Sequence, residues 1–163
     1  HAIRLGIGLY GVNPDAEFIP IDFALKPALK LLSNLVQVKQ IKKGDKVGYG
    51  STYEAKNDEW IGVVPIGYAD GWIRSHQGRC VIVEGYECEI VGRVCMDQMM
   101  IRLPKQFPMG TTVTLIGEDM PVERVAKEIG TISYEILCLI SDRVPRVYKQ
   151  NGKTIAIKKM RFE

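Results

Sequence analysis

The chain has 163 residues, 46% of them hydrophobic and 25% charged, which is ordinary for a globular protein with one sizeable core and a short appendage. The net charge of +3 comes from basic residues that are scattered along the chain, apart from Lys158, Lys159 and Arg161, which argues against nucleic-acid binding. The sequence shows no secretory signal and no apolar run near the roughly 18 residues of a membrane helix.

The first residues form an apolar run that predicts a buried strand. It covers residues 3–10, and Gly11 with the Asn-Pro pair at 13–14 predicts the turn that ends it. Because the chain opens inside this run without an initiator methionine, we expect a piece of a longer protein. Residues 15–27 carry little pattern and are a candidate linker.

The remaining sequence predicts short strands joined by glycine-rich turns. Glu84-Gly85 predicts a hairpin, and residues 61–66 suit a strand buried on both faces. One helix is predicted over residues 122–129, with Pro121 at its start and Gly130 after its end. The predicted strands are 35–41, 61–66, 80–83, 87–91, 99–103, 112–116 and 154–157. The pattern favours a mainly β protein, a barrel or sandwich with one short helix.

The four cysteines carry no metal-binding or disulfide signature. Cys80, Cys88, Cys95 and Cys138 form no Cys-x-x-Cys pair and have no ligand spacing with either histidine, which argues against zinc. We therefore expect reduced cysteines in a cytoplasmic protein. Cys95 also lacks a local base motif, which argues against its being a nucleophile.

Three segments hold more polar and aromatic residues than a core needs. In residues 47–53, Tyr49 lies between glycines, so it either approaches a ligand closely or covers the end of a barrel. Residues 66–74 follow a buried strand, and they form either a binding surface or a glycine turn with a surface ion pair. In residues 92–98, polar residues interrupt an apolar region, and any that are buried need partners. The second segment supplies Tyr68, Asp70, Trp72 and Arg74 to that candidate surface.

Five blocks, in this order and with this spacing, resemble the alanine racemases. They are Arg4-x-Gly6-Ile7-x-Leu9-Tyr10-Gly11, Tyr49-Gly-x-Thr-Tyr53, Gly67-Tyr68-Ala69-Asp70-Gly71, Gly92-Arg93-Val94-Cys95-Met96-Asp97-Gln98 and Arg143-Val144-Pro145-Arg146. The likeness extends from Arg4 to about Tyr148. A single block such as Cys-Met-Asp-Gln is weak, whereas five in order are specific.

The resemblance implies a homodimer whose subunits each have an N-terminal (β/α)₈ barrel and a C-terminal β domain. Residues 1–23 would then be the last barrel strand and its exit, and residues 24–163 the C-terminal β domain. The lysine that holds pyridoxal 5'-phosphate belongs to the barrel and lies outside this sequence. We therefore expect the chain alone to be inactive, and its apolar residues 1–23 to favour self-association.

The resemblance also implies a racemisation in which two groups serve opposite faces of the substrate. The cofactor lysine serves one face, and Tyr49 serves the L-alanine face after entering the active site of the opposite subunit. A tyrosine has a pKa near about 10, so such a base needs a nearby cation or hydrogen bonds to its phenolate. The product would be D-alanine for peptidoglycan.

Further roles follow from the same resemblance. Arg4 would face the pyridine nitrogen of the cofactor without readily giving it a proton, and the backbone amides of Gly6 and Ile7 would meet the phosphate. The main-chain amide of Met96 would meet the substrate carboxylate. The other residues assigned to the substrate region are Tyr68 at the inner mouth of the channel, Arg74 further out, Cys95, and Asp97, which would orient its neighbours.

One position departs from the family pattern. Many relatives have a tyrosine at the cofactor phosphate just before the Arg-Val-Pro-Arg block, and here that residue is Asp142. A smaller carboxylate could widen the pocket and bind a hydroxylated side chain, so we hypothesise better acceptance of serine. Two alternatives stay open: a racemase of the same architecture for serine or another amino acid, and a non-catalytic β-barrel binding module.

Overall fold

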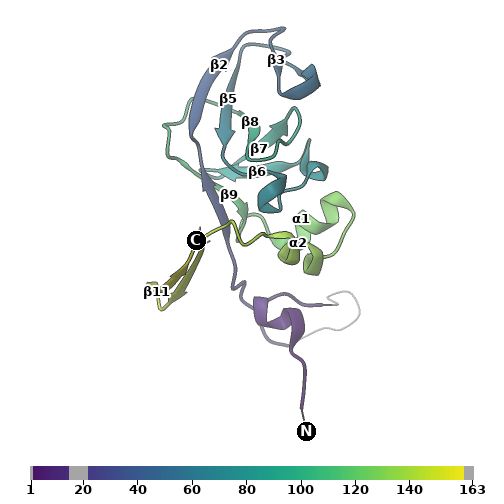
Figure 1. The fold of residues 1–163 in the computed structure, drawn as a ribbon, viewed down its shortest axis with the longest axis vertical. Helices are drawn as coiled ribbons and strands as arrows, with labels where there is room; N and C mark the ends of the chain where they lie inside the picture. The colour runs from purple at the N-terminus through teal and green to yellow at the C-terminus, as the bar shows by residue number, and fades with distance from the viewer. Residues whose placement is uncertain (1, 15–21, 160–163) are drawn as a thin grey trace.

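A seven-stranded antiparallel sheet holds most of the chain. In the computed structural model, which describes residues 2–14 and 22–159, its strands lie in the order β1-β9-β6-β7-β8-β5-β2 (Figure 1). Its strands are β1 (Leu31–Asn34), β2 (Gln37–Ile41), β5 (Glu59–Val64), β6 (Cys80–Val83), β7 (Tyr86–Val91), β8 (Met99–Leu103) and β9 (Thr112–Ile116).

The two edges of this sheet meet at a continuous segment of chain. Strands β1 and β2 are the outermost strands in the order, yet only two residues separate them in sequence. The Leu35 N–H donates to the Thr111 carbonyl on the β9 side, and the Val36 N–H donates to the Val63 carbonyl on β5. The sheet therefore curls into a barrel-like structure, which confirms the predicted mainly β class.

The core fills the inside of this curled sheet. Fully buried aliphatic side chains come from most of its strands, and in β6 and β8 consecutive residues are buried, as in strands covered on both faces. Among them are Leu35, Val64, Val81, Val83, Ile90, Met99, Ile101 and Leu115. A smaller cluster includes Ile41, Val47, Ala55, Ile61, Val91, Cys95 and Met100. This second cluster supports the two-residue strands β3 (Lys46–Val47) and β4 (Tyr53–Glu54).

Two helices follow β9 in the chain. The predicted helix is confirmed as α1 (Val122–Ile129), whose apolar face is buried and whose end is capped by Gly130 in the left-handed conformation. Helix α2 (Ser133–Leu139) packs against α1 and was not predicted, so the expectation of a single helix was wrong. No helix in the described part of the chain is long and apolar enough to span a membrane.

The strand predicted at the N-terminus is not formed. Residues Gly6–Tyr10 instead make a short 3₁₀ helix, η1. At its start Gly6 has a φ of 55°, a value that an extended strand does not contain. Ile7 is buried, but Ile3 is 83% exposed. The predicted turn at Gly11 is present, with φ of 76° and a backbone so close to Lys26 that a Cβ would lie 1.9 Å from its carbonyl oxygen.

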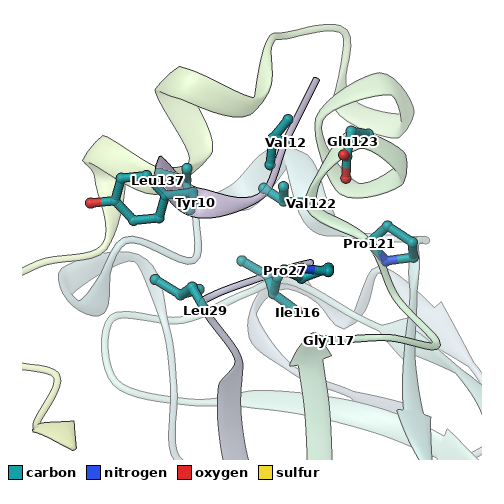
Figure 2. Close-up of a pocket in the computed structure, with 10 residues that line it drawn as sticks. All are labelled: Tyr10, Val12, Pro27, Leu29, Ile116, Gly117, Pro121, Val122, Glu123 and Leu137. Atoms are coloured by element: carbon teal, nitrogen blue, oxygen red, sulfur yellow. The ribbon is translucent and has the colours of Figure 1, made fainter. Parts of the chain in front are cut away.

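This N-terminal segment rests against the end of β9 and the two helices. Figure 2 shows Tyr10 and Val12 beside Leu29, Val122 and Leu137, which line a small pocket between η1, β9 and the helices. The Ala28 N–H donates to the Tyr10 carbonyl at 3.0 Å. Of the candidate linker, residues 15–21 lie outside the described residues.

The other predicted strands differ from the structure mainly at their ends. The ranges 80–83, 99–103 and 112–116 match β6, β8 and β9, and the Glu84-Gly85 hairpin is confirmed by positive φ at both residues. The predicted range 35–41 shrinks to β2, and 61–66 shifts to β5. The predicted 87–91 begins one residue earlier in β7, and 154–157 is longer in β11 (Lys153–Lys158). Strand β10 (Arg146–Gln150) pairs with β11 and was not predicted, nor were β1, β3 and β4.

Candidate active-site loops

Tyr49 projects from a tight turn between β3 and β4. It begins the 3₁₀ turn η2 (Tyr49–Ser51), and the glycines on either side have φ of 76° and 72°. The Arg93 guanidinium lies close to Gly50, 3.3 Å from where a Cβ would stand, and the positive φ of Gly50 favours glycine at this position. The Tyr49 side chain is 74% exposed. It therefore points outward and does not cover the end of the barrel.

The Tyr49 turn borders an open groove. The groove has a volume of about 390 Å³, and Tyr49 lines it together with Cys95, Gln98 and Met100. The first and third polar segments of the sequence therefore meet at one surface. The buried Cys95 thiol donates to the Arg93 carbonyl at 3.4 Å.

The second polar segment joins the third through backbone hydrogen bonds. Residues Tyr68–Asp70 form the 3₁₀ turn η3. The Tyr68 and Ala69 N–H groups each donate at 3.0 Å, to the carbonyls of Cys95 and Met96 respectively. A Cβ on Gly67 would lie 2.2 Å from the Cys95 oxygen, so only glycine allows the two loops this approach.

The Met96 carbonyl has a backbone hydrogen bond, whereas the Met96 N–H has none among the described residues. The carbonyl accepts the Ala69 N–H. The Met96 side chain is 53% exposed. The loop therefore presents an unused backbone donor, and the peptide that carries it is held through the Cys95 carbonyl, which accepts the Tyr68 N–H.

Arg143 connects both loops to the segment that follows α2. Its Nη2 lies 2.6 Å from Asp97 Oδ1, and its Nε lies 3.6 Å from Asp70 Oδ1. The hydrogen bond to Asp97, together with the charge of Asp70, raises the pKa of the Arg143 guanidinium. The Asp70 carboxylate also accepts the Gly67 N–H at 3.0 Å. The segment 66–74 therefore does form an ion pair, as one of its two interpretations expected. That pair, between Asp70 and Arg143, is part of a contact that joins three loops.

Trp72 and Arg74, both in the 66–74 segment, lie outside the surface formed by these three loops. Trp72 is only 3% exposed, so it belongs to the core and not to the predicted binding surface. Its buried Nε1 has no hydrogen-bond partner within the described residues. Arg74 begins the 3₁₀ turn η4 (Arg74–His76) and is exposed.

The residues assigned to the cofactor lie elsewhere in the chain. The first N–H groups of η1, those of Gly6 and Ile7, have no acceptor within the helix, and no side chain caps them. Arg4, just before them, is exposed. Figure 1 shows η1 at the opposite end of the long axis from β3 and the Tyr49 turn. The groove that Tyr49 borders and the groove beside η1 have no lining residue in common.

Asp142 lies on the segment between α2 and β10. Its side chain is 77% exposed, with the Arg146 guanidinium and the Lys158 ammonium each 3.9 Å from its carboxylate. Neighbours on this segment, Ile140 and Val144, line a groove together with Leu9 and Tyr10 of η1. The structure thus places Asp142 on a segment that flanks η1, while Arg143 reaches toward Asp97.

Other titratable groups near these loops serve the packing. Tyr53 donates to the Glu59 carboxylate, and burial with this bond raises the Tyr53 pKa to about 12. Burial raises the pKa of the Cys88 thiol to about 11. All four cysteines are free thiols. Among the described residues, no group of three or more His, Cys, Asp or Glu side chains could hold a metal ion.

Comparison with known proteins identifies the family. The family model described as "Alanine racemase, C-terminal domain" matches residues 28–148. The alanine racemase of Streptococcus mutans is 57% identical over 152 residues, which are 91% of this chain and 41% of that protein.

Solved structures give the same result. The Bacillus anthracis alanine racemase with bound L-Ala-P superposes with a TM-score of 0.91 at 49% identity, over 93% of this chain and 41% of that one. The Bartonella henselae alanine racemase with covalently bound pyridoxal phosphate superposes with a TM-score of 0.76 at 33% identity, over 83% of this chain and 38% of that one. The chain thus spans about two fifths of the length of the relatives it matches. It belongs to the alanine racemase family, and its residues 28–148 match the C-terminal domain of that family.

Proposed function

We propose that the complete protein is a pyridoxal-phosphate-dependent alanine racemase in which this chain supplies one of the two groups that move the α-proton. The observation that carries the proposal is the Tyr49 side chain, projected outward on its glycine turn beside the free Met96 amide loop. Membership of the family supports alanine as the substrate. The domain division at residues 23 and 24 is part of the proposal.

The residues present fit the cofactor. The unpartnered N–H groups at the start of η1 are donors that suit a phosphate, and the glycine there leaves open space where a Cβ would stand. Arg4 and Asp142 lie on the two segments that flank this point. When bound, pyridoxal phosphate acidifies the substrate α-proton by delocalising negative charge. Arg4 would face its ring nitrogen and, being permanently charged, would not readily give it a proton.

Tyr49 would take or return the proton at its phenolic oxygen on one face of the substrate. A tyrosine needs stabilisation of its phenolate to act near neutral pH. The Arg93 guanidinium packs against Gly50, the residue that follows Tyr49, and so places a positive charge beside the Tyr49 turn. The second base would be the cofactor lysine, which lies outside this sequence, so the chain alone is expected to be inactive.

The loops around Met96 would bind the substrate. The free Met96 N–H is a donor for the substrate carboxylate, and an apolar side chain does not impede a backbone donor. Tyr68, whose N–H is bonded to the Cys95 carbonyl, would line the way in with Arg74 further out. Cys95 would contribute to the wall of this site, because it is buried beside the groove that Tyr49 borders.

The separation of η1 and the Tyr49 turn supports a homodimer with shared sites. If Tyr49 and Arg4 act on one substrate, they must come from different copies of the chain, because η1, which follows Arg4, and β3, which precedes Tyr49, lie at opposite ends of one copy (Figure 1). We further propose that the protein works in the cytoplasm and supplies D-alanine for peptidoglycan; its free cysteines suit a reducing compartment.

The test is racemisation of L-alanine and L-serine by the complete protein with pyridoxal phosphate, beside its Tyr49→Phe variant. We expect D-alanine to form, and Tyr49→Phe to lower its rate by roughly 10²–10⁴-fold while the cofactor stays bound. Tyr86→Phe is the matched control, because that tyrosine is exposed on β7. If L-serine is racemised faster than L-alanine, the proposed substrate becomes serine. If the protein binds the cofactor but racemises neither amino acid, the result favours the alternative of a non-catalytic binding module.

A further inference from the structure

Three loops that are distant in sequence form one hydrogen-bonded unit, which we call the three-loop junction: residues 67–71, 95–98 and 139–143. Backbone bonds join the first two loops, as described above. The Ser141 N–H donates to the Asp70 carbonyl at 3.0 Å, which attaches the third. A Cβ on Gly71 would lie 2.0 Å from the Leu139 oxygen, so the first and third loops are also in close contact.

We propose that Arg143 is a positioning residue that fixes the Met96 amide for the substrate carboxylate, an inference that rests on the proposed function. On one side, Tyr68 and Ala69 donate to the Cys95 and Met96 carbonyls of the 95–98 loop, whose Cys95 N–H also closes on the Gln98 carbonyl at 2.9 Å. Arg143 holds the other side through Asp97, the residue after Met96, at 2.6 Å. The Met96 N–H belongs to the Cys95–Met96 peptide, which is held at its carbonyl by the Tyr68 N–H. Without the Arg143 contact, Asp97 loses its side-chain anchor, and the backbone torsions at Met96 that aim this N–H are less restricted.

The geometry suits an arginine. Nη2 is directed to Asp97 and Nε to Asp70, so one planar guanidinium reaches carboxylates on two loops. Asp70 is itself held, because its other oxygen accepts the Gly67 N–H. The arginine therefore ties Asp97 to a fixed point in the turn before it. A lysine has a single charged atom and can replace this arrangement only in part.

The expected kinetic effect is specific. An amide that binds the carboxylate equally in the ground state and the transition state affects KM and not kcat. In the complete protein, Arg143→Gln should raise the KM for L-alanine by roughly tenfold and leave kcat within about threefold. Competitive inhibition by propionate, a carboxylate without the amino group, should weaken in parallel. General misfolding would instead lower kcat, through the active fraction, at constant KM.

Two further variants test the contact itself. Asp97→Asn should raise KM like Arg143→Gln, and the double variant should be no worse than either single one, because both remove the same interaction. Arg143→Lys should recover part of the loss. Arg124→Gln is the matched control: Arg124 also pairs with two carboxylates, Glu87 at 2.6 Å and Glu128 at 2.8 Å, but outside the junction. Its KM should be that of the unmodified protein.

A readout that does not use activity completes the experiment. Hydrogen exchange at the Tyr68 and Ala69 amides of the complete protein, without substrate, should speed up in Arg143→Gln and not in Arg124→Gln. An unchanged KM, or a fall in kcat alone, in both Arg143→Gln and Asp97→Asn would overturn the inference while leaving a racemase. Should the unmodified protein fail to racemise alanine, the proposed function fails and this inference falls with it. If Arg143→Gln does not fold, the KM of Asp97→Asn for L-alanine tests the inference in its place.

Discussion

The indole ring of Trp72 stacks on the imidazole ring of His76, with ring centroids 3.7 Å apart and an angle of 6° between the planes. Both side chains are buried. Burial, helped by the charge of Arg79, lowers the pKa of His76 from 6.5 to about 4. At neutral pH His76 is therefore a buried, uncharged histidine at the end of η4.

This stack makes stability depend on pH. The unfolded chain takes up a proton near pH 6.5 but the folded chain only near pH 4, so stability is full above pH 6.5 and falls as the pH drops toward 4. The loss from this group should reach roughly 3 kcal/mol near pH 4. Urea unfolding of the chain at several pH values measures it. His76→Phe keeps an aromatic ring and should flatten this part of the profile; an equal slope in both would refute the assignment.

The accuracy of the sequence-based prediction differs between elements for physical reasons. Helix α1 was predicted because its apolar residues keep helical spacing between Pro121 and Gly130. The residues of α2 are mostly apolar, so they show no polar face to reveal the period. The apolar run at residues 3–10 suited a strand equally well, and only the backbone of Gly6 shows that it turns.

The sequence predicted which residues form the candidate site, but it did not predict the contacts between the loops that carry them. The sequence blocks named Tyr49, Tyr68, Met96 and their neighbours, and the structure brings the 67–71 and 95–98 loops together. The contact between Arg143 and Asp97 spans 46 positions, and nothing in the spacing indicates it. Arg143 was visible only as the first residue of the Arg-Val-Pro-Arg block. The role of Arg93 under the Tyr49 turn was likewise missed.

Gly67 should tolerate no side chain. Its φ of −151° suits any residue, so the cost of Gly67→Ala is steric: the new Cβ would lie 2.2 Å from the Cys95 oxygen and 2.4 Å from the Met96 oxygen. Because backbone carbonyls cannot move aside independently, we expect a loss of about 2 kcal/mol in unfolding free energy. Gly8→Ala, where a Cβ meets nothing within 4 Å, is the control. Similar unfolding midpoints for the two variants would contradict this reading of the loop contact.

The separation of Tyr49 and Arg4 predicts complementation between inactive subunits. Complete proteins carrying Tyr49→Phe or Arg4→Leu should each be nearly inactive as homodimers. If each site takes Tyr49 from one subunit and Arg4 from the other, a heterodimer has one intact site and one doubly altered site. Unfolding and refolding an equal mixture should then restore about a quarter of the original activity, since half the dimers are mixed. Sites built within one chain would give no recovery, since every site would carry one substitution.

Asp142 offers a test of substrate preference that carries little risk to folding. Its carboxylate is 77% exposed and 3.9 Å from each cationic partner, so exchanging it removes only weak surface pairs. If the missing ring widens the pocket and the carboxylate binds a hydroxyl group, Asp142→Tyr should lower the ratio of serine to alanine turnover in the complete protein. Asp142→Asn keeps the size and a hydrogen-bond acceptor, so its ratio should stay near that of the unmodified protein. Equal ratios for all three proteins would show that Asp142 does not set the preference, and the residues that do would then lie outside this chain or on the Met96 loop.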